Sequence, residues 1–150
     1  MPIPHLAIID PAVRMAELDC FNQLCQRTTV QTSYHLPALF GMDSLLSLQD
    51  RITCFIILGS SSSVHDRFPW QLALESWIKP QMELKKPTLG LCYGHQMLAF
   101  LFGGKVDFVF EDHRKLQGFR KIQFQENPLW KNQKFEGEIY VSHRETVVEC

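Results

Sequence analysis

One cysteine stands between two glycines in the segment 90–96, which reads Gly-Leu-Cys-Tyr-Gly-His-Gln. The short apolar segment 86–89 before it indicates a buried strand. The segment 97–102 after it predicts a helix that stops at Gly103-Gly104. Cys92 therefore stands where a strand turns sharply into a helix. This is the arrangement of a nucleophile elbow, with a thiol in place of the hydroxyl.

The spacing of the elbow has a physical reason. A side chain that points out of so tight a turn forces its own backbone into a strained region. The residues two before and two after it come too close for a Cβ, so glycine suits Gly90 and Gly94. The N-terminus of the following helix directs free N–H groups at the sulfur of Cys92, which favours the reactive thiolate. An isolated cysteine is more often buried and inert, but the whole pattern favours a catalytic one.

The composition is that of a globular protein. The 150 residues are 45% apolar and 21% charged, which is enough for one domain with a core. The net charge of −1 indicates neither nucleic acid nor an anionic membrane as a partner. No apolar run reaches membrane-span length and no signal peptide is visible, so we expect a cytoplasmic protein. The five cysteines are irregularly spaced, and we expect no disulfide framework, no metal and no cofactor.

Strand and helix patterns alternate along the chain and predict a doubly wound, mostly parallel α/β sheet of flavodoxin-like kind. The expected strands are residues 6–9, 28–34 and 52–58, of which the last is continuously apolar like a central strand. The expected helices are residues 12–26 and 70–84, the second interrupted at Pro80. Residues 105–110, 118–124 and 138–142 indicate extra, partly antiparallel strands. No linker is visible, so we expect residues 1–150 to form a single domain.

A loop of small residues, Gly59-Ser60-Ser61-Ser62-Ser63, follows the expected central strand. Its bare composition would suit a flexible linker. Its position favours a ligand-binding loop, because open α/β sheets bind ligands at the carboxyl ends of their strands.

These segments resemble the class I glutamine amidotransferases, and most of all the GMP-synthase-like members. The elbow and the following Phe-Gly-Gly-Lys-Val of residues 102–106 carry the likeness. Three weaker segments agree in order and spacing: the glycine loop at 57–66, a glycine-plus-strand segment at 118–122, and a Ser-His segment at 141–147. The resemblance covers roughly residues 52–147 and implies the amidotransferase fold.

The resemblance also implies a reaction. Cys92 would attack the side-chain amide of glutamine, form a γ-glutamyl thioester and release ammonia for a synthetase domain or partner. Backbone N–H groups would stabilise the oxyanion. The implied oxyanion donors are the backbones of Gly59, Ser60 and Tyr93, and the implied substrate-binding residues are Gln96, Ser142 and His143.

Two features depart from the family pattern. The loop reads Gly59-Ser60-Ser61 where the family often has Gly-Gly-Pro, although a serine backbone can still donate. The family's base is a histidine in a His-Pro-Glu segment after the Ser-His segment, and residues 1–150 contain no such segment. We therefore expect an amidotransferase-like domain that is incomplete at its C-terminus and impaired in catalysis.

Other histidines are weaker candidates for the base. His95 is interpreted as a packing or surface residue, and His143 as part of the Ser-His segment. The remaining histidines stand in no constellation and are expected to be solvated: His5, His35, His65 and His113.

Two alternatives stay open. The first is a γ-glutamyl peptide hydrolase on the same scaffold, with water as the final acceptor. The second is a catalytically silent homologue that binds glutamine or a partner.

Overall fold

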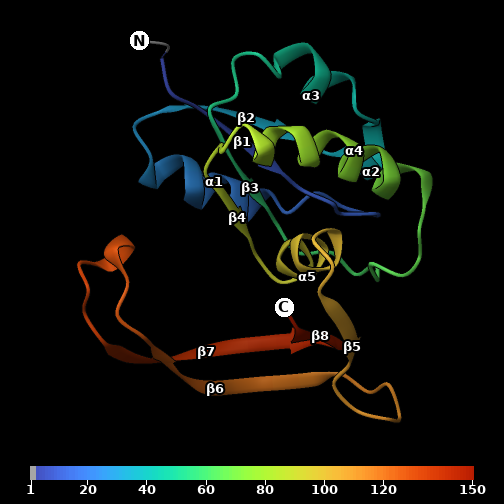
Figure 1. The fold of residues 1–150 in the computed structure, drawn as a ribbon, viewed down its shortest axis with the longest axis vertical. Helices are drawn as coiled ribbons and strands as arrows, with labels where there is room; N and C mark the ends of the chain where they lie inside the picture. Colours follow the sequence, from blue (N-terminus) through green and yellow to red (C-terminus); the bar gives the residue numbers. More distant parts are fainter. Residues whose placement is uncertain (1–2) are drawn as a thin grey trace. The chain divides into compact units, whose positions relative to one another are not determined.

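The computed structural model describes residues 3–150 and divides them into two compact units (Figure 1). The first unit contains the chain up to Val106 together with Val147–Cys150, and the second contains Asp107–Thr146. None of the helices in the described part of the chain is long and apolar enough to cross a membrane.

The first unit is built on a four-stranded parallel sheet. Its strands are β1 (His5–Ile9), β2 (Gln31–His35), β3 (Cys54–Ile57) and β4 (Thr88–Gly90). They are arranged in the order β2-β1-β3-β4, and each neighbouring pair is parallel. This confirms the predicted parallel sheet, and the order begins like that of flavodoxin-like folds. The strongly apolar strand β3 is internal, as its sequence predicts.

Helices cover both faces of this sheet. Adjacent residues of a strand point to opposite faces, so Phe55, which pairs with Ala7, and Tyr34, which pairs with Ile8, lie on different sides. Trp77 of α4 contacts Phe55 edge-on, with ring centroids 5.3 Å apart. Phe21 of α1 stacks on Tyr34 at 4.4 Å. The helices of the unit are α1 (Leu18–Arg27), α2 (Pro37–Phe40), α3 (Asp43–Leu48), α4 (Pro69–Glu83) and α5 (Tyr93–Leu101).

The core of the first unit lies between the sheet and the helices α4 and α5. Its members are apolar side chains that are almost completely removed from water, which is the main favourable term in folding. They include Ala7, Ile9, Phe55, Ile57, Leu74, Trp77, Ile78, Tyr93 and Met97.

The prediction for α1 is wrong at its N-terminus, because the helix begins at Leu18 rather than near residue 12. The carboxylate of the fully buried Asp10 explains the delay. It accepts hydrogen bonds from the backbone N–H of Ala12 at 3.0 Å and of Glu17 at 2.7 Å. These bonds hold residues 10–17 in a non-helical connection, as Asp side chains commonly do.

The predicted break at Pro80 is also wrong, because α4 continues through it to Glu83. Proline removes one backbone donor and normally kinks or ends a helix. Here Pro80 lies on the solvent-exposed side of α4. Ser76, whose carbonyl would accept from the N–H that proline lacks, is exposed as well. Burial of Ile78 and Gln81 on the opposite side holds the helix together across this position.

The expectation that His5 and His35 are solvated is wrong. Their exposed fractions are 3% and 2%. The hydroxyl of Ser33 lies 2.8 Å from Nε2 of His5 and 2.7 Å from Nε2 of His35, and the hydroxyl of Ser44 lies 2.8 Å from Nδ1 of His35. Serine hydroxyls contact both ring nitrogens of His35 and Nε2 of His5, and no local sequence pattern predicts these contacts.

The second unit is an antiparallel hairpin with its turn. Strands β6 (Leu116–Phe124) and β7 (Phe135–His143) pair from Leu116 opposite His143 to Phe124 opposite Phe135. The predicted extended, partly antiparallel segments are thus confirmed. A short 3-10 helix, η1 (Pro128–Trp130), lies in the connection. Strand β5 (Lys105–Phe108) pairs with β8 (Glu145–Glu149).

The buried imidazole of His35 predicts a loss of stability in acid. Burial, with a smaller contribution from His5, lowers the pKa of His35 from 6.5 to about 4. The unfolded chain therefore binds the proton first, and the free energy of unfolding should fall as the pH drops from 6.5 towards 4, by about 1 kcal/mol per pH unit. Urea denaturation at pH 7 and at pH 5 measures this. A His35→Gln variant should lose most of the dependence, whereas exposed His95→Gln should keep it.

Candidate functional site

Cys92 lies between the end of β4 and the first residue of α5, in the conformation that a nucleophile elbow requires. Its φ is +51° and its ψ is −108°, a region that non-glycine residues rarely adopt. The residue is exposed, so its thiol is accessible from solvent. The predicted elbow is therefore present, with the sulfur outside the core.

The two glycines of the elbow are required by close backbone contacts. A Cβ on Gly90 would lie 2.6 Å from the backbone of Gly94, and a Cβ on Gly94 would overlap the carbonyl oxygen of Ile57 and lie 2.8 Å from its Cβ. The amide of Gly94 also donates to the carbonyl of Leu58 at 3.2 Å. The first turn of α5 is thus pressed onto the end of β3, as the spacing predicts.

Gly59 is the immediate neighbour of Cys92. Ile57 pairs with Gly90 in the parallel sheet. Gly59 and Cys92 each follow this pair by two residues, so they lie side by side. A Cβ placed on Gly59 would lie 3.6 Å from the Cβ and 4.0 Å from the sulfur of Cys92. The structure brings the predicted glycine loop and the predicted nucleophile together.

Ser60 connects the same loop to the segment between β1 and α1, which contains Pro11. Its hydroxyl donates to the carbonyl of Pro11 at 2.7 Å and accepts from the amide of Ser62 at 3.1 Å. These bonds order the loop, which argues for the ligand-loop interpretation and against a flexible linker.

Tyr93 and Gln96 lie in the first turn of α5 and are both buried. The backbone N–H of Gln96 donates to the carbonyl of Cys92 at 3.0 Å, which closes this turn. Burial raises the pKa of the Tyr93 phenol above its usual range, so the group stays neutral. The first residues of a helix have backbone N–H groups without an intrahelical acceptor, so the amide of Tyr93 is available beside the sulfur.

Ser142 and His143 end strand β7 of the second unit. The hydroxyl of Ser142 lies 3.2 Å from the side-chain nitrogen of Gln117. Nδ1 of His143 lies 2.8 Å from the carbonyl oxygen of Glu145, an acceptor, so that nitrogen carries the hydrogen. This contact fixes the imidazole against the turn into β8.

The other histidines lie outside the elbow's chemistry. His95 is exposed, in agreement with its interpretation as a surface residue. His65 and His113 are exposed, as expected. Nε2 of His65 donates to the carbonyl of Val106 at 2.9 Å, because a carbonyl oxygen can only accept. In residues 3–150 no three His, Cys, Asp or Glu side chains are grouped so as to hold a metal ion.

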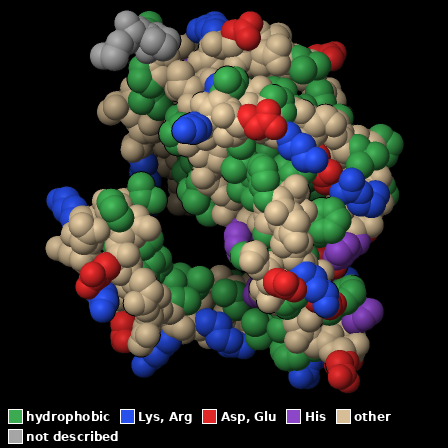
Figure 2. Space-filling model, viewed as in Figure 1, with side chains coloured by type: hydrophobic (Ala, Val, Ile, Leu, Met, Phe, Trp, Pro, Cys, Tyr) green, Lys and Arg blue, Asp and Glu red, His purple; other side chains and the backbone are tan. Residues whose placement is uncertain are grey.

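Charges on the first unit are mixed in sign. On the face shown in Figure 2, basic and acidic side chains are interspersed over this unit. On this face the charges do not form a single-sign patch of the kind that attracts a nucleic acid backbone.

The family model described as Glutamine amidotransferase class-I matches residues 50–149, which include the glycine loop, the elbow and the Ser-His segment. The chain therefore belongs to the class I glutamine amidotransferase family. The fold agrees with this. The structure of a glutamine amido transferase from Methylobacillus Flagellatus superposes with a TM-score of 0.68 and 21% identity, over 97% of this chain and 57% of that one.

The curated relatives carry two different kinds of name. A protein of Pyrobaculum aerophilum named GMP synthase (glutamine-hydrolyzing) is 34% identical over 101 residues, covering 67% of this chain and 18% of that protein. The protein of Arabidopsis thaliana named Gamma-glutamyl peptidase 4 is 42% identical over 52 residues, covering 35% of this chain and 21% of that protein. The chain thus spans about a fifth of the length of these two relatives.

Gln71 is a residue of this site that reasoning from the sequence missed. It is fully buried at the start of α4 and hydrogen-bonds the hydroxyl of Tyr93. One signal could have drawn attention to it. A glutamine three residues after a helix N-cap often reaches back to the N-cap backbone, and the amide of Phe68 does donate to Gln71 at 2.7 Å.

The contact between α5 and β3 predicts that Gly94→Ala is strongly destabilising. The new methyl group would overlap the backbone of Ile57, and overpacking of this kind costs about 1–3 kcal/mol or more. Denaturant unfolding followed by circular dichroism measures the loss. Gly137→Ala is the matched control, because nothing lies within 4 Å of its Cβ position. Equal stability of the two variants would contradict the close packing.

Proposed function

We propose that this chain is a glutamine amidotransferase in which Cys92 is the nucleophile. The sulfur adds to the side-chain amide carbon of glutamine and forms a tetrahedral oxyanion. Collapse of this intermediate breaks the C–N bond, releases ammonia and leaves a γ-glutamyl thioester, which water hydrolyses to glutamate. The observation that carries the proposal is the exposed Cys92, at +51° in φ, on an elbow of a class I family member.

The oxyanion would be held by backbone N–H groups from two segments. Tyr93 would contribute the first amide of α5, and Gly59 or Ser60 would contribute an amide from the loop after β3. Two facts support this: Gly59 is the neighbour of Cys92, and the first turn of a helix has unused donors.

The remaining substrate contacts are proposed on the family pattern. Gln96, one turn after Cys92, would help to hold the glutamine. The backbone around Ser142 and His143 would bind its α-amino and carboxylate groups.

The ammonia acceptor would be a synthetase domain or subunit, since ammonia released by such a reaction is of use only to a second reaction. Residues 1–150 would act as one cytoplasmic amidotransferase-like domain that requires no cofactor.

Catalysis by residues 1–150 alone should be slow. The leaving amide needs a proton, and the family's His-Pro-Glu segment does not occur in these residues. His143 belongs to the Ser-His segment, to which the family pattern assigns substrate binding rather than proton transfer.

Covalent labelling tests the nucleophile. A chloromethyl ketone analogue of glutamine should modify Cys92, and excess glutamine should protect it, because both occupy the same site. Peptide mass mapping locates the adduct. Cys92→Ala should abolish the labelling, and Cys150→Ala should not, although Cys150 is the other exposed cysteine. Labelling of both cysteines at equal rates would show ordinary thiol reactivity and remove the support for a glutamine site.

A second candidate, a γ-glutamyl peptide hydrolase, is favoured by the 42% identity to the Arabidopsis thaliana peptidase across a third of the chain. Glutamate release from glutamine and from γ-glutamyl dipeptides separates the two. We expect glutamine to be the preferred substrate. Its rate of hydrolysis should be about 10²- to 10⁴-fold below that of an enzyme that has its acid–base group. Preferential cleavage of the dipeptides would instead establish the hydrolase.

A further inference from the structure

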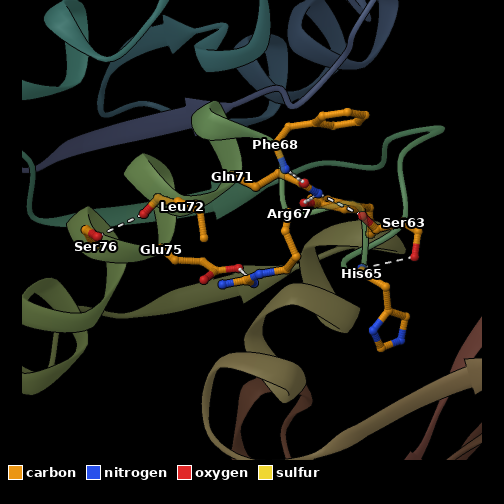
Figure 3. A network of polar contacts seen from close by, with 9 residues as sticks. Ser63, His65, Arg67, Phe68, Gln71, Leu72, Glu75 and Ser76 are labelled. Carbon is orange, nitrogen blue, oxygen red and sulfur yellow. Dashed lines mark hydrogen bonds and ion pairs between the residues drawn. The ribbon is translucent and has the colours of Figure 1, made fainter.

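Gln71 lies between the two segments that would form the oxyanion hole. Its side chain is completely buried. The side-chain nitrogen donates to the carbonyl of Ser63 at 2.8 Å and to the hydroxyl of Tyr93 at 2.7 Å, while its oxygen accepts from the amide of Phe68 at 2.7 Å. Figure 3 shows Gln71 on α4 with its amide group directed at Phe68 and Ser63.

These three bonds use the whole amide group. Both N–H groups donate and the oxygen accepts, so removal of the side chain would break all three bonds, including the bond to the buried hydroxyl of Tyr93. Ser63 ends the loop that begins at Gly59, and Tyr93 follows Cys92 directly. One side chain therefore connects the loop beside the sulfur to the helix behind it.

A second contact between the loop and α4 is weaker. Arg67 forms an ion pair with Glu75 at 2.7 Å, one turn after Gln71. The Arg67 side chain is 40% exposed, so water and salt screen this pair. The buried, uncharged bonds of Gln71 are not screened in this way, and one of them reaches the hydroxyl of Tyr93.

We propose that Gln71 is a positioning residue that sets the distance between the two halves of the oxyanion hole. This inference rests on the proposed function, because it assigns the donors to Tyr93 and to the loop from Gly59. Gln71 does not touch the substrate. It acts by holding the Tyr93 amide and the Gly59 loop at the separation that the developing oxyanion needs, where a displacement of about 1 Å can cost about a hundredfold in rate.

Two reagents distinguish this role from general support of the fold. A chloromethyl ketone analogue of glutamine reacts by addition of the thiolate to its ketone, which places an oxyanion in the hole. The sulfur then displaces chloride from the methylene carbon, and its bond to the former carbonyl carbon breaks as the ketone re-forms. Iodoacetamide reacts by direct displacement of iodide and forms no oxyanion. A defect confined to the hole should slow the first reaction and spare the second.

The test compares Gln71→Met with Gln81→Met in the 150-residue protein. Gln81 is also a buried glutamine of α4, but it accepts a hydrogen bond from Lys86 at 2.7 Å, away from the elbow. For Gln71→Met the maximal rate of labelling of Cys92 by the chloroketone should fall about tenfold or more. Its half-saturating concentration and the iodoacetamide rate should stay within about twofold. Gln81→Met should match the unmodified protein with both reagents.

Tyr93→Phe provides a milder variant. It removes only the phenol oxygen that Gln71 contacts and keeps the backbone amide, so a smaller fall with the chloroketone alone is expected. Thermal melting of each variant shows that the protein is folded when it is labelled.

Each outcome decides between the claims. Equal chloroketone rates in Gln71→Met, Tyr93→Phe and the unmodified protein would overturn the positioning role and leave the proposed function standing. A parallel loss with both reagents would assign Gln71 to the fold alone. Failure of the chloroketone to label Cys92 in the unmodified protein would overturn the proposed function and this inference with it.

Discussion

The close packing of the first turn of α5 on the end of β3 is the contact on which the site depends. Gly94 donates its amide to Leu58, and the space that its Cβ would need is filled by Ile57. Gly90 is pressed against Gly94 in the same turn. Because the backbone must reverse from strand to helix within this space, Cys92 takes a left-handed φ and its side chain points outward. The strain is maintained by the packing around it.

Two buried polar networks support the first unit, and they differ in what they reach. The imidazoles of His5 and His35 share the hydroxyl of Ser33, between β1 and β2 at one edge of the sheet. Gln71 instead joins α4, the serine loop and α5 beside the elbow. Both provide hydrogen bonds to polar groups that would otherwise be costly to bury. Of these two networks, the second includes Tyr93, the residue directly after Cys92.

The family match and the fold cover different parts of the chain. The family model begins at residue 50, after β2 and α3. The sheet nevertheless places β1 between β2 and β3, so the first 49 residues contribute two strands and part of the core. The likeness to the Methylobacillus Flagellatus structure extends over 97% of the chain and includes this region. The N-terminal strands β1 and β2 thus complete the sheet to which strands β3 and β4 of the matched segment belong.

Local patterns in the sequence were sufficient for the parallel sheet, the elbow and the loop beside it. A glycine on each side of Cys92, and a continuously apolar strand before the serine loop, encode these features within a few residues. The tertiary structure decided what depends on distant partners. The hydrogen bond from Glu17 to Asp10 keeps the residues before Leu18 out of α1. Burial of one side of α4 keeps the helix continuous across Pro80. Hydrogen bonds with Ser33 and Ser44 allow His35 to be buried. Gln71 belongs to this second group, because a glutamine near a helix start becomes part of a site only when the fold brings Ser63 and Tyr93 to the same amide.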